Sequence, residues 1–170
     1  MIVIPTEPVA ECDGVIVARA TTAEERATMI ELLEEIREHF VALGVASGRA
    51  HYDEEIAHYD EMYGPPRGRM LFALVDGEPA GCACIRDWEG GAELRRVFVR
   101  PAMRRHGVAR CLVTAAIAEA LSLDYPRMTL ITMRQFEAAV ALYQSLGFDE
   151  IEPYRPGVVK GTLAAFALDL

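Results

Sequence analysis

Residues 93–112 restrict the possible folds of this chain more than any other segment. They combine a strand pattern that ends at Val99, a turn at Arg100-Pro101 and a helix that begins near Gly107. The first amides of a helix lack intrahelical partners, and the helix dipole adds partial positive charge there. Gly107 allows a ligand to approach the backbone closely, and the neighbouring arginines add full charges. The segment therefore predicts an anion site, best suited to a phosphate or a pyrophosphate.

The rest of the chain alternates between strand-like and helix-like segments. We expect strands at residues 15–19, 70–75, 80–85, 93–99, 127–132, 151–154 and 163–170. We expect one helix from a cap at Thr21 or Thr22 to about residue 40, a break at residues 44–48, and further helices at residues 52–63, 108–123 and 137–146. This order predicts a mixed α/β sheet with helices packed on it. A chain of 170 residues can bury a core of its own, so we expect one domain over residues 1–170.

Composition argues against several classes of protein. The chain has 17 basic and 26 acidic residues and a net charge of −9, which disfavours a general nucleic-acid binder. Its longest apolar stretch, residues 111–123, is interrupted by Glu119 and is shorter than the ~20 residues that a bilayer requires. No basic residue precedes Arg19, unlike a secretory signal, and the four cysteines lack CxxC spacing, so reduced thiols are the default expectation. We therefore expect a cytoplasmic protein that binds neither nucleic acid nor membrane.

The charges are distributed unevenly along the chain. Residues 1–61 contain fourteen acidic side chains and four arginines, whereas residues 95–110 contain six arginines and no acid. One interpretation is a ligand with an anionic part at the arginines and a cationic part near the acids. The alternative is that the acids lie on a solvated helix face and pair with the arginines.

Two motifs resemble those of the GNAT superfamily, the acetyl-CoA-dependent N-acetyltransferases. Arg104-Arg105-His106-Gly107-Val108-Ala109 matches that family's Arg/Gln-x-x-Gly-x-Gly/Ala loop, and Leu142-Tyr143-Gln144-Ser145-Leu146-Gly147-Phe148 matches its Leu-Tyr-x-x-x-Gly-Phe segment. The resemblance covers about residues 15–170. It implies a GNAT-like acyl-CoA N-acyltransferase fold, in which a central, mostly antiparallel and twisted sheet is flanked by helices.

The resemblance also implies roles for particular residues. The backbone of Val97, Phe98 and Val99 would pair with the pantetheine arm of acetyl-CoA as if the arm were another strand, and an amide there would polarise the thioester carbonyl. The pyrophosphate would lie against the amides of Arg105, His106, Gly107, Val108, Ala109 and Arg110, with Arg104 at the loop entrance. Tyr143 corresponds to the tyrosine near the cofactor sulfur, where its hydroxyl can protonate the departing thiolate.

Glu93 is the candidate general base. It lies fourteen residues before Gly107, the spacing at which histone-acetylating members of the family carry their catalytic glutamate. It could accept the proton of the attacking amine directly or through a water, and strand alternation would place Arg95 and Val97 on its face. The alternative is that Glu93 only forms an ion pair with Arg95 or Arg86.

Other residues have weaker claims to function. Phe136 occupies the position, seven residues before Tyr143, where many family members have an asparagine, so the polar contact to the cofactor arm is in doubt. His51 and His58 flank two glutamates at helical spacing, but without a nearby cysteine a metal site is disfavoured and we expect none. Cys82 and Cys84 alternate onto one strand face, where buried apolar packing is favoured over an acyl-cysteine. The sequence assigns no role to Trp88, which we expect in a turn at residues 87–91.

The sequence thus predicts an acetyl-CoA-dependent N-acetyltransferase that acts on a primary amine of a small molecule or peptide by direct transfer in a ternary complex. An acidic wall from the first sixty residues would favour a cationic acceptor, whereas Arg155 in the segment 154–157 would suit a carboxylate. The alternative function is a non-catalytic CoA-binding, sensing or protein-interaction module on the same fold. A toxin-like acetylase of charged tRNA is disfavoured by the negative charge. Because relatives are often dimers, the resemblance also suggests a homodimer.

Overall fold

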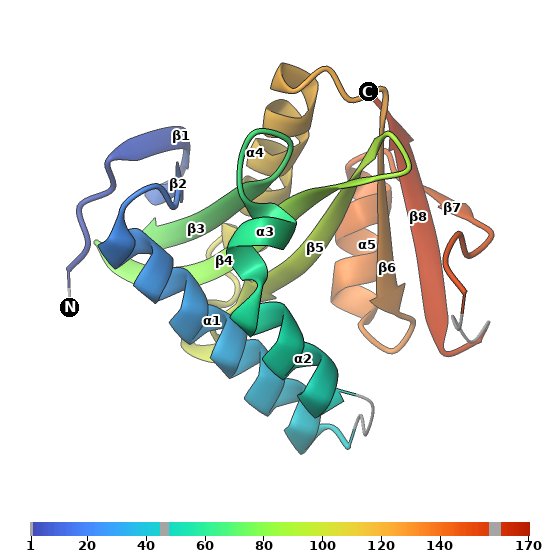
Figure 1. Ribbon diagram of the computed structural model, residues 1–170, viewed down its shortest axis with the longest axis horizontal. Coiled ribbons are helices and arrows are strands. Elements are labelled where there is room, and N and C mark those ends of the chain that lie inside the picture. The colour runs from blue at the N-terminus through green and yellow to red at the C-terminus, as the bar shows by residue number, and fades with distance from the viewer. Residues whose placement is uncertain (1, 45–47, 157–160) are drawn as a thin grey trace.

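The protein is built on one eight-stranded sheet with helices on both faces (Figure 1). The computed structural model describes residues 2–44, 48–156 and 161–170. The strand order is β1-β2-β3-β4-β5-β6-β8-β7, and all neighbours are antiparallel except β5 and β6. The strands are β1 Glu7–Cys12, β2 Val15–Arg19, β3 Arg69–Val75, β4 Glu78–Trp88, β5 Gly91–Val99, β6 Arg127–Met133, β7 Asp149–Ile151 and β8 Leu163–Asp169. The prediction of a mixed, mostly antiparallel sheet is confirmed.

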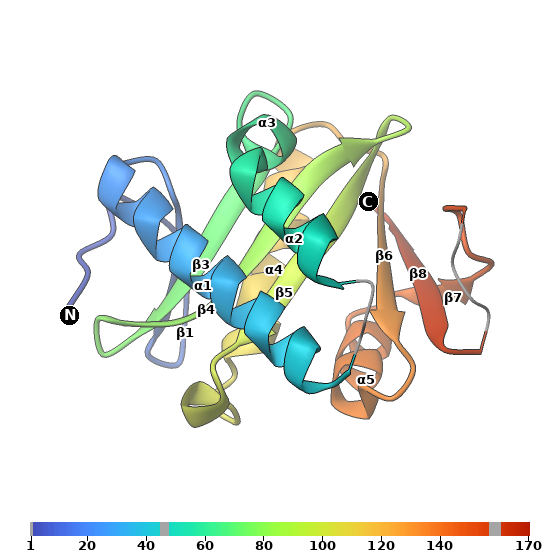
Figure 2. The same ribbon diagram turned by 60° about the horizontal axis from the view of Figure 1, so that its bottom comes forward.

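The helices divide between the two faces of the sheet. α1 (Ala23–Ala42), α2 (Gly48–Ala57) and α3 (Tyr59–Tyr63) lie on one face, while α4 (Val108–Ser122) and α5 (Glu137–Ser145) lie on the other (Figure 2). A short 3₁₀ turn, Pro101–Met103, connects β5 to α4. A capping box fixes the start of α1: the Thr22 hydroxyl accepts from the Glu25 amide at 3.2 Å, and Glu25 accepts from the Thr22 amide at 2.9 Å.

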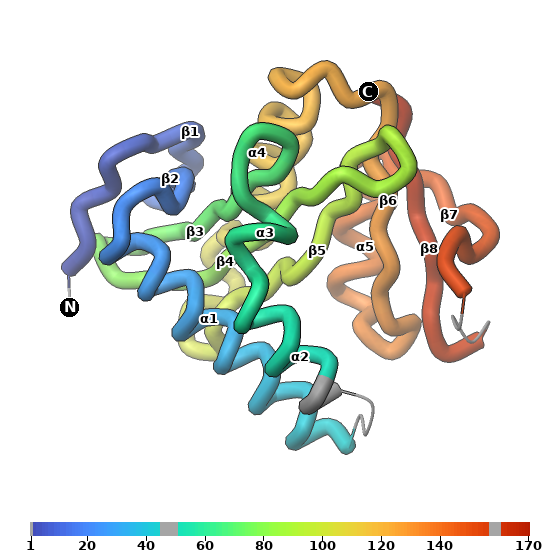
Figure 3. Tube along the Cα trace, viewed as in Figure 1, coloured from blue at the N-terminus to red at the C-terminus, as the bar shows by residue number. Residues whose placement is uncertain are grey.

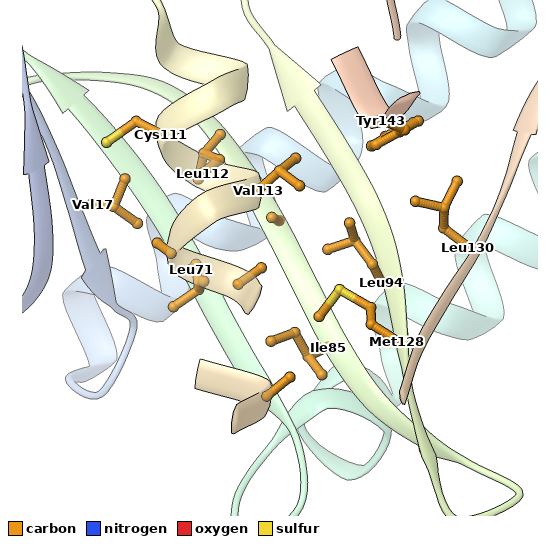
Figure 4. Packing of buried hydrophobic residues seen from close by; sticks show 14 of the residues in the cluster. Val17, Leu71, Ile85, Leu94, Cys111, Leu112, Val113, Met128, Leu130 and Tyr143 are labelled. Atoms are coloured by element: carbon orange, nitrogen blue, oxygen red, sulfur yellow. The ribbon is translucent and has the colours of Figure 1, made fainter. Parts of the chain in front are cut away.

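Each face of the sheet has its own apolar core. On the α4 face, Leu112 and Val113 of the helix pack toward Val17, Leu71 and Ile85 of three strands, all of them buried (Figure 4). On the opposite face, the predicted stripe of α1 packs against β3 and β4, with Met29, Leu33 and Ile36 buried. Burial of this apolar surface on both sides holds the middle strands in place.

β5 and β6 form only a short ladder and then separate. They pair at Ala92 with Met128 and at Glu93 with Thr129, whereas β5 stays paired with β4 as far as Val99. The two traces meet at one end and diverge toward the other (Figure 3). Beyond Glu93, one edge of β5 therefore has unpaired backbone groups facing the gap.

A β-bulge in β5 changes which side chains share a face. Arg95 lies opposite Cys84 and Phe98 lies opposite Cys82, so the bulge inserts an extra residue at Arg96, whose φ is +57°. Val97 consequently packs with the α4-face core, whereas Glu93 and Arg95 face the opposite side. The prediction that Val97 shares the face of Glu93 is wrong, because it assumed uninterrupted alternation.

Several predicted boundaries differ from the structure. β1 was not expected; it forms a hairpin with β2 through Asp13-Gly14, both at positive φ. The helix expected at residues 52–63 is two helices, the strand expected at 151–154 ends at Ile151, and Trp88 ends β4. Of the break expected at residues 44–48, residues 45–47 lie outside the described part of the chain. No helix among the described residues is long and apolar enough to cross a membrane.

Two of the cysteines are bonded, contrary to the expectation of reduced thiols. Cys12 at the end of β1 forms a disulfide with Cys111 in the first turn of α4, with Cα atoms 6.0 Å apart. The two residues are separated by 99 positions, so their spacing in the sequence could not reveal the pair. Cys82 and Cys84 are fully buried in the α1-face core. Burial raises the pKa of Cys82 to about 12 and raises that of Cys84 well above its ordinary value, so both thiols are protonated groups packed in the core, as favoured from the sequence.

Candidate active site

A pocket of about 830 Å³ lies in the region where β5 and β6 diverge. Its walls come from β5, the loop and N-terminus of α4, the start of α5 and the end of α1. Most predicted cofactor-binding residues line it: Val97, Phe98, Val99, Arg104, Arg105, Gly107, Val108, Ala109, Arg110 and Tyr143. Two predicted site residues, His106 and Glu93, do not line this pocket.

The N-terminus of α4 forms one end of the pocket. Gly107 is the N-cap at φ +76°, and a Cβ added there would meet no atom within 4 Å. The first helical hydrogen bond runs from the Cys111 amide to the Gly107 carbonyl, so the amides of Val108, Ala109 and Arg110 have no acceptor within the helix. These amides, the helix dipole and the open space over Gly107 fit a pyrophosphate.

The arginine side chains of this loop are exposed, and two of them each donate a hydrogen bond to a neighbouring group. Arg104 donates to the Val99 carbonyl at 3.4 Å, and Arg110 donates to the Ser145 hydroxyl at 2.8 Å. His106 places Nδ1 2.9 Å from the Arg104 carbonyl. The imidazole therefore holds the loop in shape, while Arg104, Arg105 and Arg110 lie around the mouth as cations.

Tyr143 occupies the inner part of the pocket wall. It extends from α5 toward Leu94 and Leu130 in the core (Figure 4), and it is 6% exposed. Burial raises its pKa, so the phenol is protonated at neutral pH. A buried, protonated phenol beside the free edge of β5 can donate a proton to a group in the pocket.

Phe136 belongs to the same pocket and packs against α1. It is the N-cap of α5, and its ring lies edge-on to Phe40 with centroids 6.0 Å apart. Phe40 in turn stacks on Tyr52, at 5.8 Å. The aromatic ring therefore contributes an apolar wall where many family members have an amide, and Gln135 beside it lines the pocket as a polar group.

Glu93 lies in an ion-pair network rather than facing an open space. It is 1% exposed and accepts from Arg86 Nε at 2.6 Å and from the Tyr154 hydroxyl at 2.9 Å. Arg155 Nε lies 3.2 Å from its Oε1, and Arg95 lies 3.7 Å from its Oε2. Both ion pairs considered from the sequence are therefore present, and the Tyr154 hydroxyl donates to the same carboxylate.

The six arginines at residues 95–110 separate into two groups. Arg95, Arg96 and Arg100 bind acids of the first sixty residues: the first two pair with Glu55, and Arg100 pairs with Glu35 at 2.6 Å. The other three surround the pocket mouth. The interpretation as ion pairs with acids therefore holds for the first three of these arginines, and the interpretation as an anion site fits the other three.

Sequence reasoning missed the buried group around Glu55. Glu55 on α2 is 3% exposed and binds Arg96 and the Tyr63 hydroxyl, while Tyr52 accepts from Arg96 at 2.7 Å. Burial alone would raise the pKa of Glu55, but hydrogen bonding and charge from Arg96, with Arg95 and Tyr63, hold it at about 2. The sequence pattern indicates only a helix at residues 52–63, and tertiary contacts are needed to reveal its buried face. His51 lies 3.7 Å from Glu55, whereas His58 contacts Glu61, so the two histidines have different partners.

A sheet that opens between two parallel strands, above a glycine-capped helix N-terminus, defines an acyl-CoA-binding acyltransferase fold. Comparison with known proteins agrees. The sequence model of the acetyltransferase (GNAT) family matches residues 27–148. An uncharacterized N-acetyltransferase of Schizosaccharomyces pombe is 34% identical over 122 residues, which are 70% of this chain and 75% of that protein. The chain therefore belongs to the GNAT family and is an acyltransferase that uses acetyl-CoA as cosubstrate.

Two further proteins are similar to this chain. The IAA acetyltransferase of Azospirillum brasilense is 28% identical over 147 residues, covering 84% of this chain and 90% of that protein. The Salmonella typhimurium protein yncA, whose structure contains its cofactor acetyl-CoA, superposes with a TM-score of 0.69 at 24% identity, covering 92% of this chain and 94% of that one. The second likeness shows a shared fold.

Proposed function

We propose that the protein transfers the acetyl group of acetyl-CoA directly to a primary amine of a small molecule or peptide within a ternary complex. The observation that carries this proposal is the single pocket that combines the free edge of β5, the glycine-capped start of α4 and the Tyr143 phenol. Acetyl-CoA supplies a thioester whose carbonyl carbon accepts the amine. We also propose that residues 1–170 form one domain of this kind.

The backbone of the chain holds the cosubstrate. The unpaired edge at Val97–Val99 offers amide and carbonyl groups to the amides of the pantetheine arm, and one of these amides polarises the thioester carbonyl. The amides of Val108, Ala109 and Arg110 bind the pyrophosphate, with the surrounding arginines adding charge.

Two side chains move protons in this proposal. The Tyr143 hydroxyl donates its proton to the departing thiolate and recovers one from solvent. The attacking amine passes its proton to the Tyr154 oxygen while Tyr154 passes its own to Glu93, along the 2.9 Å hydrogen bond between them. The short contact with Arg86 and the nearby Arg95 and Arg155 also support the alternative that Glu93 only organises these arginines.

Thermal melting with millimolar acetyl-CoA, CoA or ATP, followed by measurement of free CoA in an amine panel, tests the proposal. A ligand at ~100 times its Kd should stabilise the protein by about 2.7 kcal/mol. We expect a rise in Tm with acetyl-CoA and CoA but not with ATP, and amine-dependent release of CoA. Binding without release for any amine would instead support the non-catalytic CoA-binding module, which family membership disfavours.

A further inference from the structure

A cluster of buried charges lies beside the point at which β5 and β6 separate. Arg86 of β4 lies opposite Glu93 of β5 in the antiparallel register, and Arg95 follows two residues later on the same face. The segment after β7 brings Tyr154 and Arg155 onto Glu93 from the other side of the gap. We call this group, together with Arg96 and Glu55 of α2, the arginine cluster; its charged members are Arg86, Arg95, Arg96, Arg155, Glu55 and Glu93.

The arginine cluster has more positive than negative charge. Four guanidinium groups meet two carboxylates in the described part of the chain, and both carboxylates are shared. The shortest contacts to Glu93 and Glu55 are made by Arg86 and Arg96, respectively. Arg95 has longer contacts to the same carboxylates, 3.5 Å to Glu55 and 3.7 Å to Glu93, although its side chain is buried, with only 9% exposed. A buried cation is strongly unfavourable without full compensation.

Arg155 is the second under-compensated cation. Its Nε is buried and lies 3.2 Å from Glu93 without the alignment of a hydrogen bond. Its guanidinium also lies 5.8 Å from the centre of the Trp88 ring, on which Arg86 is placed at 4.9 Å. Burial, together with the charges of Arg95 and Arg86, lowers the pKa of Arg155 despite Glu93. These contacts describe a site with positive potential and an aromatic wall.

The arginine cluster is placed to contact an acceptor rather than the cosubstrate. Phe98 and the end of α1 line the pocket on the face of the sheet that also carries Arg95, and Arg95 precedes the first pocket residue of β5, Val97. The amine and the carboxylate of an α-amino acid share one carbon atom. An amino acid whose amine attacks in the pocket therefore directs its carboxylate toward the face that carries Arg95.

We propose that Arg95 and Arg155 bind a carboxylate of the acetyl acceptor, so that the acceptor is an amino acid or another small amine with a carboxylate close to the amine. The inference rests on the proposed function. Of the two kinds of acceptor that the sequence suggested, this inference favours one with a carboxylate, indicated by Arg155, over a cationic one, suggested by the acidic first sixty residues. Glu35 and Glu55 of that region are engaged with arginines, while Glu31, Glu34 and Glu38 are exposed on α1.

The test compares matched acceptors with the purified full chain. Each of the twenty common amino acids is assayed beside its carboxamide and its decarboxylated amine, with kcat/KM measured from release of free CoA. We expect the best acceptor to be a free amino acid whose kcat/KM exceeds that of its carboxamide at least tenfold. Arg155→Gln should remove most of this ratio, mainly through KM, and Arg155→Lys should restore part of it. Arg127→Gln is the matched control, because Arg127 is an exposed arginine whose ion pair is with Asp169.

A binding measurement separates this inference from the proposed function. The best amino acid and, for comparison, its carboxamide are titrated into the CoA-bound protein by calorimetry. We expect the amino acid to bind, Arg155→Gln to abolish this binding, and Arg127→Gln to preserve it. Acetylation of amines with no preference for the carboxylate would overturn the inference and leave the proposed function intact. Carboxylate binding that depends on Arg155 without acetylation would support a carboxylate site at Arg155 but overturn both its assignment to an acetyl acceptor and the proposed function. Absence of both binding and acetylation for every amino acid would overturn the inference.

Discussion

Replacing Gly107 with alanine separates a cost in backbone energy from a loss of ligand binding. Gly107 has φ +76°, and an added Cβ meets no atom within 4 Å, so the only folded-state cost is that of alanine in the left-handed region, about 1–2 kcal/mol. In a chain of this size each kcal/mol lowers Tm by roughly 2–4 °C. We therefore expect Gly107→Ala to melt about 2–8 °C below the wild type without ligand.

Gly90→Ala is the matched control for this experiment. Gly90 has φ +81° and equally open surroundings, so its replacement should lower Tm by a similar amount. It lies before the first residue of β5, however, and the pocket meets the other end of that strand, roughly 25 Å away. The two variants thus share the backbone cost and differ in their distance from the pocket.

Ligand-induced stabilisation should differ between the two variants. At ~100 times its Kd, acetyl-CoA stabilises the native state by about 2.7 kcal/mol. A methyl group over the amides of α4 should weaken pyrophosphate binding at least tenfold and reduce this gain to about 1.4 kcal/mol, whereas Gly90→Ala should keep the full gain. Melting curves with and without acetyl-CoA measure both quantities. Equal ligand-induced rises in the two variants would refute the anion site, and unequal losses without ligand would refute the reasoning from φ.

Three further expectations concern catalysis and stability. Tyr143→Phe should lower kcat by roughly 10²-fold or more while leaving the Kd for CoA nearly unchanged, and an unaltered kcat would contradict the acid role. Burial opposes ionisation of Glu25, yet its hydrogen bonds at the start of α1 hold its pKa at about 2, below the ordinary 4.5. Its contribution to stability is therefore full above pH 4.5 and is lost as pH falls toward 2, so urea unfolding should distinguish Glu25→Gln from the wild type at pH 7 but not near pH 2. The disulfide between Cys12 and Cys111 closes a loop of 99 positions, and the reduced entropy of the unfolded chain should stabilise the protein by about 4–5 kcal/mol. Dithiothreitol should therefore lower Tm in the wild type and not in a Cys12→Ser, Cys111→Ser double variant.

The features that could be predicted from the sequence are those formed by residues near each other in the chain. The strand, turn and helix from Glu93 to Leu112 lie within twenty residues, so their spacing already grouped Gly107 with Arg104, Arg105 and Arg110, which line one end of the pocket. The apolar stripe of α1 follows in the same way from helical periodicity. β1 was also accessible, because Asp13-Gly14 is a strong hairpin signal directly before the apolar segment at residues 15–19.

Long-range pairing limited the rest of the prediction. Glu55 and Arg96 are 41 positions apart and Glu93 and Tyr154 are 61 apart, and neither pair follows from local pattern. The count of charges allowed two interpretations of the six arginines at residues 95–110, and it did not show which arginines follow which interpretation. Tertiary packing decides which arginines are neutralised, because α2 carries one acid onto β5 and α1 carries another to the end of that strand.

The bulge at Arg96 explains how one strand supports both halves of the site. Strict alternation after Arg95 would point Arg96 into the apolar core on the α4 face, where an unpaired cation costs several kcal/mol. A positive φ costs only about 1–2 kcal/mol, and it turns Arg96 toward Glu55 and Tyr52 on α2. The conformation with the bulge is therefore the lower in free energy. The same extra residue brings Val97 and Val99 onto the face of the α4 core while Arg95 stays in the arginine cluster. One inserted residue thus places Arg96 in the arginine cluster and Val97 and Val99 on the opposite face of the same strand.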